Sequence, residues 1–196
     1  MKRTTTGLSA ILASLSITCT VLPLKAATIM ESEFLSWATV VTYETAPTGT
    51  YDSPFIFDGL THTANVGGFS LQNDPIDGGL SGISWIATGS NAEVDILLPF
   101  GMTQAGLRMG KSSARSATIE FYDGVSLLHS QNVSITSGTT FVGFENPTGT
   151  ISRLRVIETG AFSMAFDDVT FAAVPEPSST ALLGLGGLAL MLRRRR

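Results

Sequence analysis

The stretch Ala117-Thr118-Ile119-Glu120-Phe121 alternates apolar and polar side chains, which is the period of a strand with one buried face. Asp123-Gly124 follows it, a pair of residues typical of tight hairpin turns. Residues Val125–Val133 then return with a weaker alternation. The segment therefore predicts a β-hairpin.

The residues that follow predict more strands. Thr140–Phe144 and Ile151–Ile157 flank the turn signal Asn146-Pro147-Thr148-Gly149, which indicates a second hairpin. Phe162–Phe171 predicts a closing strand. Its alternation changes phase at Asp167-Asp168, so we expect a bulge or a bend there.

The first half of the chain is less regular. Glu33–Tyr43 fits either a strand or a short helix. Four further short strands are expected between Gly, Asp and Asn turns, namely Phe55–Phe57, Phe69–Leu71, Gly82–Ile86 and Glu93–Leu98. Short strands at close spacing favour a sandwich over alternating β and α elements. The sequence predicts an all-β fold, a β-sandwich of jelly-roll type.

The N-terminal segment has the pattern of an export signal. Lys2 and Arg3 precede an apolar stretch, Leu8–Leu24, and the small Ala26 stands before a plausible cleavage point. We expect residues 1–26 to be a signal peptide. The chain's single cysteine, Cys19, lies within it, so the processed protein would contain no thiol.

The C-terminal segment combines four features in order. An extended Pro175-Glu176-Pro177 element precedes a short polar spacer, the apolar stretch Ala181–Leu192 and the terminal cluster Arg193, Arg194, Arg195 and Arg196. As a helix the apolar stretch would span about 18 Å, against roughly 30 Å of bilayer hydrocarbon. The arginine cluster favours a cytoplasmic C-terminus. We expect a short hydrophobic helix that contacts the membrane transiently, with the folded domain outside.

This order of features resembles the PEP-CTERM sorting signal of Gram-negative bacteria. The resemblance implies that an exosortase, a membrane cysteine enzyme, removes the tail near the Pro-Glu-Pro element. It also implies export through the inner membrane, followed by location at the cell surface or in an exopolysaccharide matrix. The expected organisation is a signal peptide at 1–26, a β-sandwich domain at 27–173 and a sorting signal at 174–196.

The charge of the folded region limits the partners. Residues 27–174 contain fifteen of the 16 acidic residues but only five of the 12 basic ones, a formal net charge of −10. No Lys or Arg occurs from Thr28 to Leu107. This argues against a nucleic-acid surface and against docking on anionic lipid. Divalent cations and neutral glycans are the better candidates.

Few residues suggest catalysis. No Gly-x-Ser-x-Gly sequence occurs, and His62, near a turn, and His129, in a predicted strand, are the only histidines. Neither has neighbours of ligand type, so we expect no zinc enzyme. Glycoside hydrolysis needs only two carboxylates, but no pair is singled out. We expect a non-catalytic protein.

Acidic residues leave a calcium site open. The loop Asn73–Gly79 carries three oxygen side chains, and Asp52 and Asp58 flank a short apolar strand. Phe166–Phe171 contains an Asp-Asp-Val sequence that resembles the ending of jelly-roll carbohydrate-binding modules. That resemblance implies a structural Ca²⁺ held by an Asp of this pair. We expect Asp168 to be this ligand, with Glu31 or Glu33 from the first strand as partners.

Five aromatic residues of the folded region could stack on sugar rings, namely Trp37, Tyr43, Tyr51, Trp85 and Tyr122. We favour Trp85 and Tyr51 for glycan binding, because both lie beside turn signals. The sequence thus leaves three hypotheses in order of preference: a structural or adhesive protein of an exopolysaccharide matrix, a carbohydrate-binding module and a glycoside hydrolase.

Overall fold

A computed structural model describes residues 25–72, 84–87, 92–111, 115–136, 138–158 and 165–173. The predicted signal peptide up to residue 24, the sorting segment from residue 174 and the acidic loop at 73–79 lie outside the described residues.

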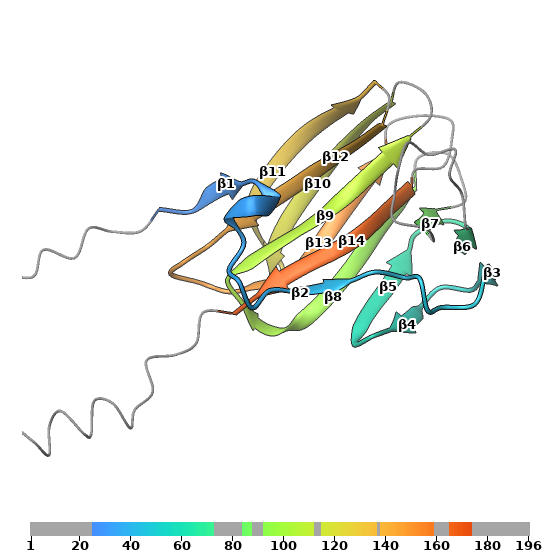
Figure 1. Cartoon of the computed structure of the whole chain (residues 1–196), viewed down its shortest axis with the longest axis horizontal. Coiled ribbons are helices and arrows are strands. Elements are labelled where there is room, and N and C mark those ends of the chain that lie inside the picture. The colour runs from blue at the N-terminus through green and yellow to red at the C-terminus, as the bar shows by residue number, and fades with distance from the viewer. Residues whose placement is uncertain are drawn as a thin grey trace, which may run out of the picture.

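Within the described residues the chain forms two antiparallel sheets that pack face to face (Figure 1). The larger sheet has the strand order β1-β12-β9-β14-β7-β6-β3, and β2 pairs with β14 beside this path. Its strands are β1 (Ala27–Ile29), β2 (Thr39–Val41), β3 (Gly49–Tyr51), β6 (Phe69–Gln72), β7 (Ser84–Ala87), β9 (Gln104–Lys111), β12 (Gly138–Glu145) and β14 (Ala165–Ala172). A single 3-10 turn in this part of the chain, η1 (Glu31–Glu33), separates β1 from β2.

The six-stranded sheet has the order β11-β10-β13-β8-β5-β4. Its strands are β4 (Phe55–Phe57), β5 (Leu60–Ala64), β8 (Glu93–Met102), β10 (Arg115–Asp123), β11 (Ser126–Ile135) and β13 (Ile151–Glu158). From β8 to β14 the chain crosses between the sheets five times. The predicted all-β sandwich is confirmed, and this crossing connectivity is typical of the jelly-roll type.

Two local predictions are also confirmed. Asp123 pairs with Ser126 across the β10–β11 turn, where Gly124 has a positive φ of 56° that glycine adopts without strain. In β14 the register shifts between Asp167 and Thr170, and Asp168 has a φ of 48°. This is the bulge that the change of phase at Asp167-Asp168 indicated.

The second predicted hairpin is wrong. β12 pairs with β1 and β9 in the eight-stranded sheet, whereas β13 pairs with β10 and β8 in the other. The turn after Glu145 therefore forms a corner between the sheets. The physical reason is a close approach of β12 to β9, where Gly143 pairs with Gly106. A Cβ at Gly106 would lie 2.7 Å from the Val142 carbonyl oxygen, so glycine is required there.

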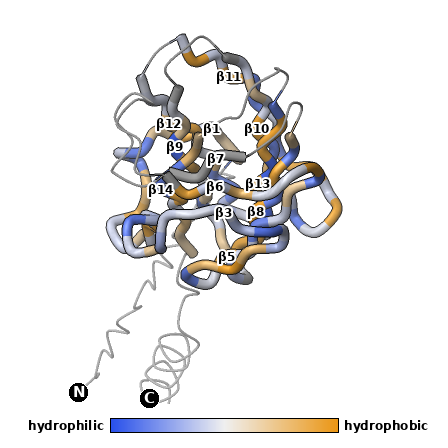
Figure 2. The backbone as a smooth tube through the Cα atoms, turned by 90° about the vertical axis from the view of Figure 1, so that its right-hand side faces the viewer, coloured by the Kyte–Doolittle hydropathy of each residue, from blue (hydrophilic) through white to orange (hydrophobic). Residues whose placement is uncertain are grey.

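The two inner faces supply one core of buried apolar side chains. Figure 2 shows how hydrophobic and hydrophilic residues follow one another along the chain. The largest fully buried side chains are Tyr43, Phe69, Phe121, Phe144 and Phe166. They come from both sheets and from the loop after β2. The core is therefore aromatic as well as aliphatic, which gives these rings several edge-to-face and tilted contacts.

His62 follows the turn at Asp58-Gly59, as expected, but it lies in a strand and its side chain belongs to this core. It is fully buried in β5, and its Nε2 lies 2.7 Å from the Tyr43 hydroxyl. Nδ1 lies 3.4 Å from the Phe55 carbonyl oxygen, to which it donates. Nε2 is therefore the acceptor for the Tyr43 hydroxyl proton. Burial lowers the pKa of His62 from 6.5 to about 4 and raises that of Tyr43 well above 10.

This pKa shift predicts a pH dependence of stability. The pKa of His62 is lower in the folded than in the unfolded protein, so folding favours the neutral imidazole. The free energy of unfolding is therefore highest above pH 6.5 and falls as the pH is lowered from 6.5 toward about 4. The shift corresponds to about 3 kcal/mol. Chemical denaturation between pH 7 and 4 should show this loss, and His62→Gln, which keeps an acceptor for Tyr43, should lose stability less steeply. Equal slopes for the variant and the parent protein would contradict a buried neutral His62.

Candidate functional site

The outer face of the six-stranded sheet carries a row of polar side chains that crosses five strands. Antiparallel pairing places Ser130, Glu120, Arg155, Asp95 and Thr63 opposite one another from β11 to β5. Directly paired residues project from the same face of a sheet. Acidic and basic side chains therefore alternate along this polar row.

A second row lies beside the first, two residues away along β10, β13, β8 and β5 and three residues away along β11, where the register shifts. It consists of Leu127, Tyr122, Arg153, Leu97 and Thr61. Leu97 and Leu127 are exposed hydrophobic residues, and Tyr122 is half-buried. The outer face thus pairs a polar row with a mixed row that is partly apolar. Five strands at about 4.8 Å give each row a length of about 19 Å.

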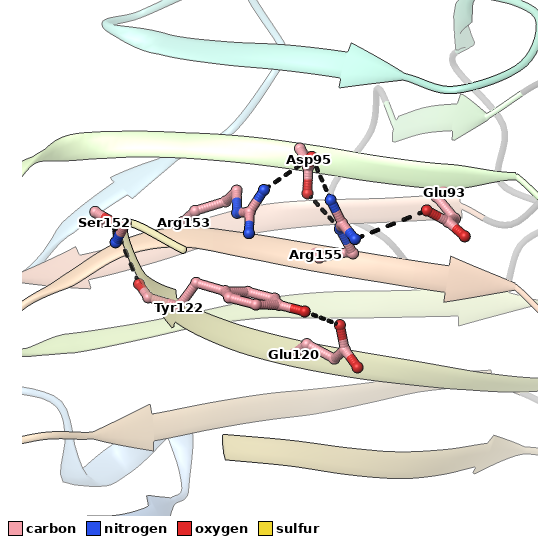
Figure 3. Close-up of polar contacts among 8 residues, drawn as sticks. Glu93, Asp95, Glu120, Tyr122, Ser152, Arg153 and Arg155 are labelled. Carbon is pink, nitrogen blue, oxygen red and sulfur yellow. Dashed lines mark hydrogen bonds and ion pairs between the residues drawn. The ribbon is translucent and has the colours of Figure 1, made fainter. Parts of the chain in front are cut away.

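Ion pairs fix the centre of this outer face (Figure 3). Arg155 donates from Nε to Asp95 Oδ1 at 2.7 Å and from Nη2 to Oδ2 at 3.0 Å, a bidentate geometry. Arg153 Nη1 donates to the same Oδ2 at 3.2 Å. Glu93 lies farther from Arg155, at 3.9 Å. The hydrogen bonds to Asp95 raise the pKa of Arg155 above its ordinary value, so this cation stays charged.

Tyr122 lies next to these cations. The Arg153 guanidinium carbon is 4.1 Å from the centre of the tyrosine ring, and that of Arg155 is 5.6 Å away. The hydroxyl donates to Glu120 Oε2 at 2.6 Å, and this hydrogen bond raises the pKa of Tyr122. The tyrosine ring therefore contacts the neighbouring strand β13, and its hydroxyl is fixed by a residue of its own strand β10 (Figure 3).

The chemistry of the outer face follows from these fixed groups. Guanidinium groups donate hydrogen bonds, carboxylates accept them, and the hydroxyls of the flanking Thr61, Thr63 and Ser130 can do both. Leu97, Leu127 and the ring of Tyr122 add apolar surface to the row beside these polar groups. Such a face can bind a ligand that is itself amphipathic, with hydroxyls at its rim and an apolar side.

The favoured glycan-binding residues of the sequence analysis lie elsewhere. Tyr51 is in β3, half-buried, with its hydroxyl donating to the Pro47 carbonyl and its ring against Phe55, the centroids 4.4 Å apart. The backbone of Trp85 in β7 pairs with Leu71 on one side and Phe166 on the other. Both belong to the eight-stranded sheet, so they are separate from the outer face described above. Their role in glycan binding stays a prediction.

The structure does bring two of the predicted calcium ligands together. Arg108 donates to both carboxylate oxygens of Glu31, and its Nε donates to Asp168 Oδ2 at 3.1 Å. Glu33 instead accepts from the Met30 amide at 2.6 Å. Burial lowers the pKa of Arg108, but Glu31 and Asp168 raise it more. The cation that these carboxylates share is thus a guanidinium.

Among the described residues there is no group of three or more His, Cys, Asp or Glu side chains that could hold a metal ion. Calcium binding through Asp168 stays a prediction that would require displacement of Arg108.

Sequence reasoning included Tyr122 among five aromatic candidates but did not favour it. The sequence feature that could have placed Tyr122 on the outer face is the alternation of β10, in which Thr118, Glu120 and Tyr122 lie on the polar side. Of the others, Tyr43 is in the core, and Trp37 is exposed, with its indole Nε1 donating to the Ala173 carbonyl at 3.1 Å.

Residues 173–196 match the PEP-CTERM protein-sorting motif, which confirms the resemblance found in the tail. The motif implies an exported protein that an exosortase processes. In the part of the chain that the structure describes, no helix is long and apolar enough to cross a membrane, and Ala181–Leu192 lies outside that part. No curated protein matches the chain.

Three solved structures resemble the fold distantly. TmCBM61 in complex with beta-1,4-galactotriose has a TM-score of 0.39 and 10% identity, over 59% of this chain and 88% of that one. A family 6 carbohydrate-binding module has a TM-score of 0.41 and 12% identity, over 69% and 94%. The enzymatically active domain of bacteriophage CBA120 tailspike protein 4 has a TM-score of 0.37 and 15% identity, over 60% and 20%. At these scores the similarity carries no inference about a binding site.

The ion-pair geometry predicts unequal effects of two acidic substitutions. Asp95→Asn should destabilise the protein by about 2 kcal/mol, because two half-buried guanidinium groups lose their shared carboxylate. Glu93→Gln is the matched control on the same strand, with a more exposed carboxylate and a longer contact. It should change stability by less than about 0.5 kcal/mol. Equal losses in urea denaturation would contradict the central role of Asp95.

Proposed function

We propose that this protein is a non-catalytic, adhesive component of an extracellular polysaccharide matrix and that the outer face of its six-stranded sheet binds the polysaccharide. The sorting motif at residues 173–196 supports export and exosortase processing. The β-sandwich domain, residues 27–173, is the part that remains outside the cell. Its location is the surface or matrix of a Gram-negative bacterium.

The observation that carries the binding proposal is the pair of adjacent rows on that face. Sugar rings present hydroxyls at their edges and apolar C–H surface on their faces, and aromatic side chains stack on the latter. Tyr122, Leu97 and Leu127 match the apolar surface, while Asp95, Glu120 and the two arginines match the hydroxyls. The two arginines and three acids, Glu93 included, leave almost no net charge, which favours a neutral polysaccharide over a strongly charged one.

The geometry supports binding more than cleavage. A glycoside hydrolase of the usual kind needs one carboxylic acid with a raised pKa and one free carboxylate. Asp95 here accepts hydrogen bonds from two guanidinium groups, and Glu120 accepts one from the Tyr122 hydroxyl, so neither carboxylate is free. Such groups are suited to hydrogen bonding with hydroxyls.

Processing of the tail gives the first test of this proposal. Intact-mass analysis of the protein isolated from the native host's matrix should show a C-terminus that lacks the cluster Arg193, Arg194, Arg195 and Arg196. The reason is that the short apolar stretch is a poor permanent anchor and follows a recognised sorting element. Recovery of protein that still ends at Arg196 from the matrix would contradict processing.

The glycan site is tested by retention on the host's own matrix polysaccharide. Processed protein carrying Tyr122→Ala should be retained about threefold to tenfold less than the parent protein, which is the usual contribution of one aromatic contact. Val125→Ala, at the exposed tip of the same hairpin, is the control and should be retained normally. Reducing ends released in the same incubation should not increase.

Three results would contradict this account. Equal retention of Tyr122→Ala and the parent protein would remove the outer face as the site. Loss of retention in Tyr51→Ala alone would move the site to the eight-stranded sheet. Release of reducing ends would favour the glycoside hydrolase hypothesis over binding.

A further inference from the structure

Both ends of the described domain leave the sandwich at the same place. The pairings join Ala27 to Glu145, Glu145 to Gln104 and Gln104 to Ala172, so one row crosses β1, β12, β9 and β14. Ala27 and Ala172, the first and last members of this row, are three strand spacings apart, which is about 14 Å. Figure 1 shows the start of β1 and the end of β14 at the same end of the sheet. We call this the terminal end.

Two exposed apolar side chains, those of Trp37 and Val125, lie at the terminal end. Trp37 is 56% exposed, and its indole donates to the carbonyl of Ala173, the last described residue. Val125 is 94% exposed at the tip of the β10–β11 hairpin. The neighbouring Gly124 amide donates to Ser152 Oγ, and the adjacent Ile151 pairs with Met102, two residues before Gln104. The hairpin tip is therefore at the terminal end too.

The opposite end differs. Val66 follows β5, beyond Asn65, whose amide donates to the Glu93 carbonyl at the start of β8. β8 runs from there to Met102, a length of about 30 Å. Val66 is the one exposed large hydrophobic residue at that end among those described. Among the described residues, Trp37 and Val125 are thus exposed at the terminal end and Val66 at the opposite end.

The length of chain beyond the domain limits how far the terminal end can be from a bilayer. Ala173 is followed by only seven residues before the apolar stretch begins at Ala181. Eight residue steps span at most about 28 Å when fully extended. The polar headgroup region takes about 6 Å of this span. The far end of the sandwich cannot approach the membrane unless the whole domain turns over.

We propose that the terminal end is the membrane-facing surface of the unprocessed protein, with Trp37 and Val125 lying among the phospholipid headgroups. Tryptophan is the residue type most suited to this position, because its ring is apolar and its N–H has a partner, here the Ala173 carbonyl. The Pro175-Glu176-Pro177 element begins two residues after Ala173. Its covalent link to this surface limits its distance from the bilayer, where a membrane enzyme can reach it. The inference rests on the proposed anchoring by the tail, and removal of the tail ends the contact.

Fluorescence quenching by brominated lipid tests this directly. The unprocessed protein is isolated from host membranes in which processing is blocked and is reconstituted into phosphatidylcholine vesicles with or without bromine on the acyl chains. Trp85→Phe leaves Trp37 as the only tryptophan, since the chain contains two. Its emission should be about twofold weaker in brominated vesicles, as expected for a ring at the interface. In the parent protein, Trp37→Phe should abolish the lipid-dependent part of the emission.

Matched probes at the two ends provide the control. In a Trp37→Phe and Trp85→Phe background, Val125→Trp should be quenched, whereas Val66→Trp should emit equally in both kinds of vesicle. Co-flotation of the protein with the vesicles reports anchoring separately. Protein that floats while Trp37 and Val125→Trp are unquenched would overturn the membrane-facing end alone. Protein that does not float would contradict anchoring by the tail, and this inference with it.

Discussion

The register of β13 between β10 and β8 is the constraint on which the outer face depends. Leu154 and Val156 point into the core and are almost fully buried, so they fix which side of β13 faces inward. A slip of one residue would bury Arg153 and Arg155 instead and would expose the apolar residues. The same register brings the two arginines opposite Asp95 and Tyr122. Burial of apolar surface thus supplies most of the stability and positions the charged groups. The ion pairs mainly fix the orientation of the charged side chains.

The eight-stranded sheet has a different role. The two chain ends leave from β1 and β14 of this sheet. Their paths depend on the close β9–β12 contact at Gly106 and Gly143 and on the β14 bulge at Asp168. Arg108 links η1 to that bulge through Glu31 and Asp168. We therefore assign the two sheets separate tasks: one presents a face to a polysaccharide, and the other holds the exits of the chain near the membrane before processing.

Local features of the structure could be predicted from the sequence, because their causes are local. The Asp123-Gly124 turn and the phase change at Asp167-Asp168 are readable from neighbouring residues, as is the order of elements in the sorting tail. The corner between β12 and β13 depends on partners far away in the chain, so a turn signal alone could not distinguish it from a hairpin. The Arg155–Asp95 pair spans 60 residues, and only the register reveals it. The burial of His62 depends on its contact with Tyr43, 19 residues earlier in the chain, so the turn beside it could not reveal it.

The central claim is that the outer face of the six-stranded sheet binds polysaccharide. The most direct measurement is a nuclear magnetic resonance titration of the processed, isotope-labelled protein with oligosaccharides cut from the host matrix. The account predicts that shifts will cluster on the outward residues of β8, β10 and β13, with Tyr122, Arg153 and Asp95 among the largest. Shifts confined to β3 and β7, around Tyr51 and Trp85, would contradict it, as would an unchanged spectrum at saturating oligosaccharide.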